Sequence, residues 1–302
     1  MKRIITSLVA VTMLTCASAQ TASSLFMRSD SLEVSEIASP VGVIYNKVGH
    51  HGPAVENIAS AFRLYFNDSG AIDAYCKRSG TMELMKYKWY PTAEQQENEG
   101  AGCDEYAVSK TIGLGGIALW DGTGEVSLVA TKGRTGRVGK TDDGSFCEII
   151  AYGVEYKGTM VDVAMRIDVH DGSRVADVTA WELNGRKLRF VTGLNYHDGA
   201  DIHIARGRIT VWGVHPPDVA KTPHALGSAL WYKPSRFGRV ERTEKVLRIV
   251  SRPCRTIHTS ILSCSAMEPE SGELAPGVPA LGSETAFDAY VSGRHVSINA
   301  DF

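Results

Sequence analysis

The feature that most constrains the fold is a succession of short segments in which apolar and polar residues alternate, separated by turn residues. Residues 61–66 alternate, residues 67–70 are a turn signal (Asn-Asp-Ser-Gly), and residues 71–76 alternate again. This order predicts an antiparallel hairpin, because alternation places the apolar side chains of each strand on one face. Strands are predicted in the same way at residues 125–131, 146–156, 159–168, 174–183, 188–194 and 208–214.

The spacing of these segments predicts an all-β fold, an antiparallel β-sandwich. Asp-Gly or Asn-Gly pairs stand between them at residues 143–144, 171–172 and 184–185, and such pairs favour tight turns. Helical periodicity is weak, so we expect only short helices or 3₁₀ turns, near residues 53–58 and 91–97. The chain of 302 residues contains no repeat and no low-complexity linker, which predicts one domain over residues 20–302.

Residues 1–19 have the pattern of a secretory signal. Lys2 and Arg3 precede a short apolar run, and Ala17-Ser18-Ala19 has the small residues of a cleavage site. The run is too short to span a bilayer. We therefore expect a periplasmic or secreted protein with no membrane span. The alternative is a lipoprotein attached through Cys16, although Thr15 fits poorly before a modified cysteine.

Composition and short motifs argue against several classes of function. The formal net charge is −2, which leaves no basic footprint for nucleic acid. The run Gly113-Leu114-Gly115-Gly116 lacks the spacing of a nucleotide-binding loop and fits a loop that crosses close to a sheet or a ligand. No G-x-S-x-G motif of a serine hydrolase and no C-x-x-C pair is present. We interpret the cysteines after the signal as buried thiols, with Cys76–Cys103 and Cys254–Cys264 as alternative disulfides.

The aromatic residues fit a protein that binds sugar chains. A sheet with alternating faces can line a groove, and a long sugar chain needs aromatic platforms and hydrogen-bond donors there. Each aromatic residue can instead belong to the core. The residues available as platforms are Trp89, Tyr90, Trp120, Trp181, Trp212, Trp231 and Tyr232.

The densest polar segment surrounds His50 and His51, directly before Gly52-Pro53. Glu56 and Asn57 follow within a few residues. Before a Gly-Pro turn both imidazoles can approach one cleft, and a histidine near neutral pH can give or take a proton. The alternative interpretation is a surface turn with solvated histidines.

The predicted hairpin after this turn carries a polar face. Arg63, Tyr65 and Asn67 share the side opposite to Phe62 and Leu64. Because arginine pairs with carboxylates in a fork geometry and tyrosine can serve as an acid or a base, this face can bind an anionic sugar. The alternative is an ordinary solvated strand face.

A loop at residues 102–110 contributes Asp104, Tyr106 and Lys110 as candidate site residues. The basic run at residues 132–137 is interpreted as an exposed hairpin loop, which can also contact sulfate or carboxylate groups.

A third polar cluster lies between residues 195 and 215. His197 and His215 stand at predicted strand ends, where they can line a groove together with Trp212. A metal site at His197, Asp198 and His203 is the alternative, but the spacing matches no established ligand motif. We expect neither a metal nor a cofactor.

The string His50-His51-Gly52-Pro53-Ala54-Val55-Glu56-Asn57, followed by Phe62-Arg63-Leu64-Tyr65-Phe66 and Gly70-Ala71-Ile72-Asp73-Ala74-Tyr75, resembles the ulvan oligosaccharide dehydratase family. These bacterial proteins were formerly grouped as a domain of unknown function found in polysaccharide utilisation loci. Residues 112–122, 190–194, 209–213 and 226–230 are also similar, so the resemblance covers nearly the whole mature chain. It implies a β-sandwich akin to galactose-mutarotase-like domains. It also implies loss of water from unsaturated, uronic-acid-ended oligosaccharides left by an ulvan lyase.

Loss of water next to a uronate needs a base, an acid, and groups that hold the carboxylate. Residue type and motif position suggest which residues act as base, acid and carboxylate-binding groups. The acid–base candidates are His51, His50, Tyr106 and His215. The candidates for binding the anionic oligosaccharide are Asn57, Arg63, Tyr65, Asp104, Lys110, His197 and Trp212.

Two other classes of function stay open from the sequence. A polysaccharide lyase or a sugar epimerase also uses histidine and tyrosine on a β-sandwich, and a carbohydrate-binding protein needs only the groove. A glycoside hydrolase is not excluded either, because its carboxylate pair follows no local spacing rule.

Overall fold

The computed structural model describes residues 20–88, 91–217 and 223–294. The predicted signal segment and the aromatic pair Trp89 and Tyr90 lie outside the described residues. The described chain is mostly β-structure, and its named strands pair in antiparallel fashion, which confirms the predicted fold class. None of the helices in the described ranges is long and apolar enough to cross a membrane.

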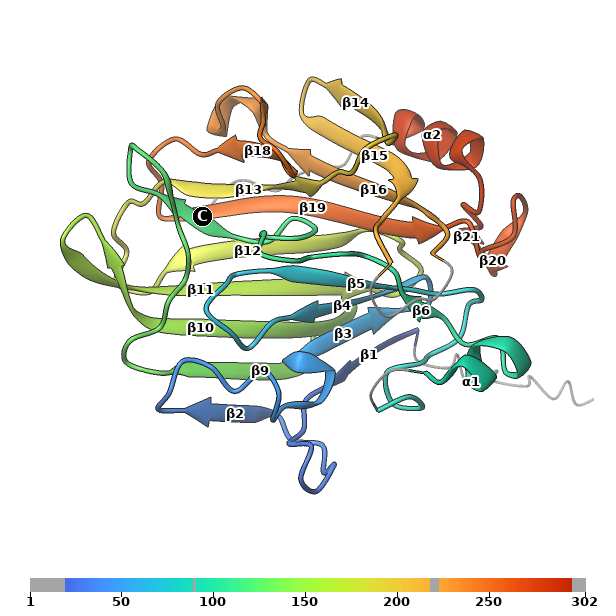
Figure 1. The fold of residues 1–302 in the computed structure, drawn as a ribbon, viewed down its shortest axis with the longest axis horizontal. Helices are drawn as coiled ribbons and strands as arrows, with labels where there is room; N and C mark the ends of the chain where they lie inside the picture. Colours follow the sequence, from blue (N-terminus) through green and yellow to red (C-terminus); the bar gives the residue numbers. More distant parts are fainter. Residues whose placement is uncertain (1–19, 89–90, 218–222, 295–302) are drawn as a thin grey trace, which may run out of the picture.

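The larger sheet has nine strands within the described residues, with β19 inserted between β16 and β12. Its long central strands lie side by side across the molecule (Figure 1). The order across the sheet is β14 (Asp201–Ala205), β15 (Arg208–Val214), β16 (Ala225–Tyr232), β19 (Thr256–Ser265), β12 (Ala176–Glu182), β11 (Thr159–His170), β10 (Gly144–Tyr156), β9 (Arg134–Lys140) and β2 (Glu36–Ser39).

The second layer consists of two five-stranded sheets. The first is β1 (Thr21–Ser24), β3 (Ala54–Asn57), β4 (Ser60–Leu64), β5 (Ile72–Cys76) and β6 (Cys103–Asp104), and the second is β17 (Glu241–Arg242), β18 (Val246–Val250), β13 (Phe190–Asn195), β7 (Ala118–Trp120) and β8 (Glu125–Val126). The glycine-rich loop joins them, because Leu114 N–H donates to Ile72 O and Gly115 N–H donates to Gly193 O. A Cβ at Gly113 would lie 2.0 Å from Ile72 O, so the loop does cross close to a sheet.

The core lies between the two layers. Phe62, Leu64 and Phe66 of the predicted hairpin are fully buried and pack with residues such as Ile167 and Ile261 of the larger sheet. The predicted hairpin is thus confirmed, since β4 and β5 pair with Arg63 opposite Asp73. Burial of this kind stabilises a fold by about 25 cal/mol per Å² of apolar surface.

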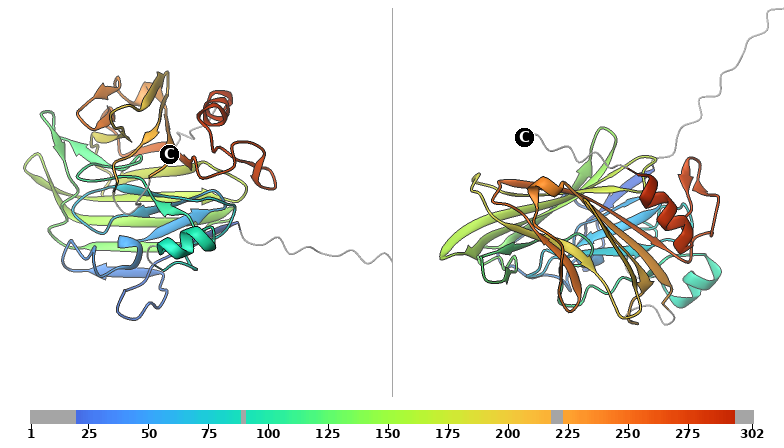
Figure 2. Two further views of the ribbon diagram at one scale, coloured as in Figure 1. Left: turned by 45° about the vertical axis from the view of Figure 1, so that its right-hand side comes forward. Right: turned by 90° about the horizontal axis from the view of Figure 1, so that it is seen from above.

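Few helices accompany the sheets in the described residues. The predicted helix near residues 91–97 is confirmed as α1, which begins after a capping box at Thr92. Helix α2 packs Phe287 and Val291 against Trp231 and Leu262 at the margin of the larger sheet (Figure 2). The remaining bounds are η1 (Gly49–His51), α1 (Ala93–Asn98), η2 (Pro234–Arg236), β20 (Glu273–Ala275), β21 (Val278–Pro279) and α2 (Glu284–Gly293).

Three local predictions were wrong. Residues 53–58 form strand β3 and not a helix, because residues 54–56 pair with β4 and a turn at Asn57 returns the chain. The predicted strand at residues 125–131 is reduced to β8. The basic run is not simply an exposed loop, since Arg134 begins β9 and is buried, donating hydrogen bonds to Leu128 O and Gly42 O.

The cysteines of the described residues carry free thiols. Four are buried, as the sequence predicted, and Cys254 is half-buried. Cys76 and Cys103 face each other across β5 and β6 without a bond between them.

Candidate functional site

The turn η1 presents two consecutive histidines in the left-handed backbone region, with φ of 53° at His50 and 62° at His51. Residues with a Cβ seldom adopt this conformation, and where they do the surrounding structure must hold them. Close packing does so here: a Cβ at Gly49 would lie 2.1 Å from the Phe26 ring, and one at Gly52 would lie 1.8 Å from Leu64 O. Such strain concentrates at functional sites, which favours the functional interpretation of this turn.

The His51 imidazole stacks on the Tyr45 ring, with 3.8 Å between the ring centroids and 8° between the planes. Its Nδ1 lies 3.3 Å from Tyr45 O. A carbonyl oxygen can only accept, so this contact places the proton on Nδ1 and leaves Nε2 as the basic nitrogen. Burial lowers the pKa of His51 to about 4. The ring is therefore neutral near pH 7.

Beside His51 lies a buried network built on strands β4, β5 and β6. Arg63 forms ion pairs with Asp73 and Asp104, the latter over 2.7 Å. The Tyr65 hydroxyl donates to Asp73 Oδ2 over 2.8 Å, and the Tyr65 ring packs edge-on against Tyr45. We call these residues, together with Tyr45 and His51, the His51 cluster.

The surroundings of Asp73 in the His51 cluster make its carboxylate easier to protonate than that of an exposed aspartate. Burial raises the pKa of Asp73, the Arg63 guanidinium lowers it, and the Asp104 carboxylate raises it again. The pKa of Tyr65 is also raised, first by burial and then by the charge of Asp73. Buried carboxyl groups with raised pKa values are typical of acid–base sites, although structural ion pairs also perturb pKa values.

His50 lies inside the protein, on the side of Arg63 where a small internal cavity is found. It is 2% exposed, contacts the edge of Phe26, and has a pKa lowered to about 3, mainly by burial. It lines a cavity of about 10 Å³ together with Arg63, Tyr75 and Tyr87. A cavity of that size has room for about one water molecule, so substrate does not reach His50 in this conformation.

Tyr106 and His215 form a second, buried cluster. The Tyr106 hydroxyl accepts from Asn195 N–H, and the ring lies 4.5 Å from the His215 ring. His215 Nδ1 accepts from Ala107 N–H over 3.0 Å and lies 3.2 Å from His197 Nε2. Burial lowers the pKa of His215 to about 3. These contacts fix the loop at residues 102–110 against β13. The Tyr106–His215 cluster therefore holds this loop in place.

Three other predicted site residues lie apart from the His51 cluster. The Asn57 side chain is buried and accepts from Ala59 N–H and Ser60 N–H, so it holds the β3–β4 turn. Trp212 packs on Phe287 of α2, with ring centroids 5.6 Å apart. Lys110 is exposed at the end of its loop. Arg63, expected to bind a substrate carboxylate, instead pairs with two carboxylates of the protein.

Two members of the cluster were missing from the predicted site. Tyr45 lies outside the alternating segments, and only folding of η1 brings it under His51. Asp73 had a signal in the sequence, since the predicted hairpin register places it opposite Arg63. No group of three or more His, Cys, Asp or Glu side chains suited to a metal occurs in the described ranges, and His203 is exposed.

Comparison with protein families identifies the relationship. The model of the domain of unknown function DUF4861 matches residues 9–254. The chain belongs to this family. The DUF4861 match includes every residue of the His51 cluster and ends just before strand β19.

Other comparisons add little to the DUF4861 assignment. No curated protein matches the chain. Solved structures that match include the 4-alpha-glucanotransferase from Thermococcus litoralis, with 8% sequence identity and a TM-score of 0.34. The match covers 76% of this chain but 40% of that enzyme, so the chain spans well under half of its length. A TM-score this low carries no argument.

Proposed function

We propose that the protein is a hydro-lyase that removes water from unsaturated, uronic-acid-containing oligosaccharides of the kind released in ulvan degradation. The observation that carries the proposal is the pairing of a neutral histidine with a hydrogen-bonded tyrosine–carboxyl pair in one cluster. The His51 ring packs edge-on against the Tyr65 ring, with 6.1 Å between the ring centroids, and the Tyr65 hydroxyl donates a hydrogen bond to Asp73. The resemblance of this segment to the ulvan oligosaccharide dehydratase family supports the choice of reaction and substrate.

Elimination of water needs one proton taken and one proton given. A hydrogen leaves one carbon as a proton, its electron pair forms the new carbon–carbon double bond, and the neighbouring hydroxyl departs with a proton as water. In this proposal His51 Nε2 takes the carbon-bound proton. The Nδ1 contact with Tyr45 O orients the ring and stabilises the imidazolium that forms.

Tyr65 and Asp73 supply the proton for the leaving hydroxyl. While Asp73 is ionised, the Tyr65 hydroxyl donates to it and is not available to substrate. When Asp73 is protonated, the hydrogen bond can reverse, and the Tyr65 hydroxyl can then donate to the leaving group. The raised pKa of Asp73 favours this state. Arg63 holds Asp73 in place and counteracts the repulsion from Asp104.

The decisive experiment is mass spectrometry after incubation with lyase-digested ulvan. The proposal expects a product lighter by one water with the chain length kept. His51→Ala should abolish the product, whereas His203→Ala, which replaces an exposed histidine, should leave turnover unchanged. A product with a shortened sugar chain would indicate a polysaccharide lyase. A new isomer of unchanged mass, separated by chromatography, would indicate an epimerase. The absence of any new product would indicate a binding protein. Each of these results would overturn the proposal.

A further inference from the structure

Two adjoining cavities lie where strands β16, β18 and β19 begin or end. The first, of about 200 Å³, is lined by the loop after β12, by η2 and by residues 253–258 at the start of β19. The second, of about 430 Å³, is lined by residues around Trp120, Arg189 and the segments flanking β18. Phe237 and Pro253 line both cavities, so the two cavities are neighbours.

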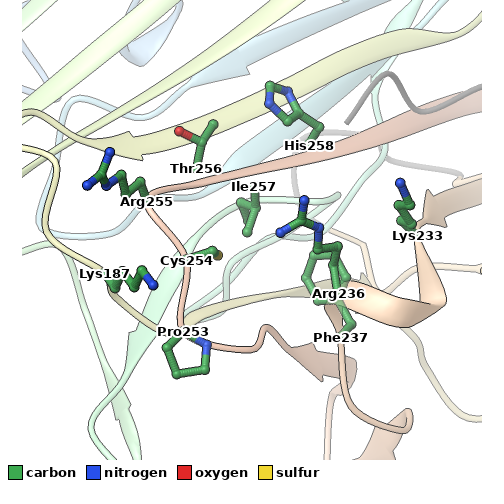
Figure 3. A pocket seen from close by; sticks show the side chains of 10 residues that line it. All are labelled: Lys187, Lys233, Arg236, Phe237, Pro253, Cys254, Arg255, Thr256, Ile257 and His258. Carbon is green, nitrogen blue, oxygen red and sulfur yellow. The ribbon is translucent and has the colours of Figure 1, made fainter. Parts of the chain in front are cut away.

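Four basic side chains line the first cavity (Figure 3), and others line the second. Six of them are exposed: Lys187, Lys233, Arg236, Arg239, Arg252 and Arg255. None of the six forms an ion pair with another described residue. We call the two cavities and these six residues the basic groove.

The acidic side chains near the basic groove are already engaged. Glu241 lines the second cavity but accepts two hydrogen bonds from Arg248, over 3.0 and 2.9 Å. The charge of Asp177 raises the pKa of His258, which lines the first cavity. Asp177 accepts a hydrogen bond from Ser260 Oγ and contacts His170. Basic side chains therefore outnumber acidic ones among the residues that line the two cavities, and positive charge in a cleft concentrates anionic ligands.

The floor of the basic groove is suited to a sugar ring. Phe237, Cys254 and Ile257 line the first cavity with apolar surface, and Trp120 lines the second. Sugar rings offer apolar faces to such surfaces, while cationic donors at the rim reach substituents that carry charge. Arginine side chains pair with planar or tetrahedral oxyanions through two donors at once.

We propose that the basic groove is a binding site for an anionic polysaccharide chain, which it holds through carboxylate or sulfate groups. The identity of the ligand as a glycan rests on the function proposed above, whereas the charge and shape of the groove do not. No residue of the His51 cluster lines either cavity. In this proposal the basic groove therefore holds a part of the polysaccharide other than the sugar that reacts.

The test measures binding separately from turnover, by affinity gel electrophoresis with undigested ulvan, which lacks the unsaturated ends of the digested oligosaccharides. The variant Lys233→Gln/Arg236→Gln/Arg255→Gln removes three charges from the basic groove. The matched control, Lys47→Gln/Lys157→Gln/Arg206→Gln, removes three exposed charges elsewhere. We expect the groove variant to weaken binding about tenfold or more, since surface charge contacts add up over three sites, and the control to change it less than about twofold.

Binding should also weaken as salt rises, because exposed charges are screened. Equal binding by the groove variant and the control, or no binding by the unaltered protein, would overturn the inference. Tighter binding of a single-stranded oligonucleotide than of ulvan at equal salt would overturn the assignment to a glycan.

The variant His51→Ala should bind ulvan as the unaltered protein does. If this variant kept its turnover while the groove variant lost binding, the proposed catalysis would fall and the binding site would stand.

Discussion

At the scale of single residues, His51 and His50 show how neighbouring positions acquire different roles. Both have left-handed backbone and both are neutral near pH 7, since burial lowers their pKa values to about 4 and about 3. His51 stacks on Tyr45 and is 7% exposed, while His50 lines an internal cavity with Arg63. In the proposed mechanism His51 is therefore the residue that transfers the proton, whereas His50 packs inside the protein.

Replacing Tyr65 by phenylalanine tests the proposed acid. Tyr65→Phe removes the hydroxyl that donates to Asp73 but keeps the ring against Tyr45. We expect kcat for water loss to fall roughly 10²- to 10⁴-fold, the usual contribution of a general acid, while the unfolding temperature changes little. Tyr152→Phe, at a half-exposed tyrosine, is the matched control. Unchanged kcat in Tyr65→Phe would show that the proton comes from another group.

Replacing Asp73 by asparagine tests the ion-pair network. Asp73→Asn leaves the buried Arg63 guanidinium with Asp104 as its remaining carboxylate partner. Removing one partner of a buried pair typically costs about 3 kcal/mol in the free energy of unfolding, measured here by urea denaturation. Asp142→Asn, at an exposed aspartate, should change this free energy by less than about 0.5 kcal/mol. A loss in Asp73→Asn no larger than in the control would contradict the structural role of the network.

At the scale of elements, the position of η1 depends on its contact with strand β4. Leu64 N–H donates to Pro53 O, and Phe66 N–H donates to His51 O. The approach of Gly52 to Leu64 O leaves no room for a side chain. The backbone at the end of β4 therefore determines where the His51 ring lies relative to Tyr65.

Adding one methyl group at Gly52 should disturb this arrangement. Gly52→Ala places a Cβ against the backbone oxygen of Leu64, which cannot move aside as a side chain can. We expect a lower unfolding temperature and a loss of turnover, measured by calorimetry and by the mass assay. Gly124→Ala is the control, because nothing lies within 4 Å of its added Cβ and its φ is not positive. Equal unfolding temperatures in the two variants would show that η1 tolerates a shift.

The same elements show what the sequence could predict. Alternation predicted the β4–β5 hairpin and its apolar inward face, although the polar face with Arg63 and Asp73 is buried as well. It could not predict β3, because Ala54-Val55-Glu56-Asn57 places two apolar residues before two polar ones and so shows no alternation in the sequence. The basic groove was also missed. Its lining comes from segments far apart in the chain, residues 187, 233–237 and 253–258 among them, and no local pattern joins them.

At the scale of the whole molecule, buried neutral histidines make stability depend on pH. The pKa values of His50 and His215 are lowered to about 3 from an ordinary value of 6.5. Between those values the unfolded chain binds protons that the folded protein does not. The contribution of each histidine is therefore complete above pH 6.5 and is lost as the pH falls toward 3, by about 1.4 kcal/mol per pH unit.

The variant His50→Gln should reduce this dependence. Urea denaturation at pH 7 and pH 5 should show a smaller loss of unfolding free energy in the variant than in the unaltered protein, by about 1.4 kcal/mol per pH unit. The raised pKa of Asp73 acts in the opposite direction, but it is common to both proteins and cancels in the comparison. His203→Gln, at an exposed position, should keep the original slope. An unaltered slope in His50→Gln would show that His50 is protonated in the folded protein.

The place of β19 in the larger sheet has a consequence for the order in which the protein can be made. Strand β19, at residues Thr256–Ser265, pairs with β12 on one side and β16 on the other. Until the ribosome has synthesised this segment, both neighbours expose an unpaired edge, and the two halves of the sheet have no hydrogen bonds between them. The sheet therefore closes only after residue 265 has been synthesised, and a nascent chain released before that point should require chaperones to avoid aggregation.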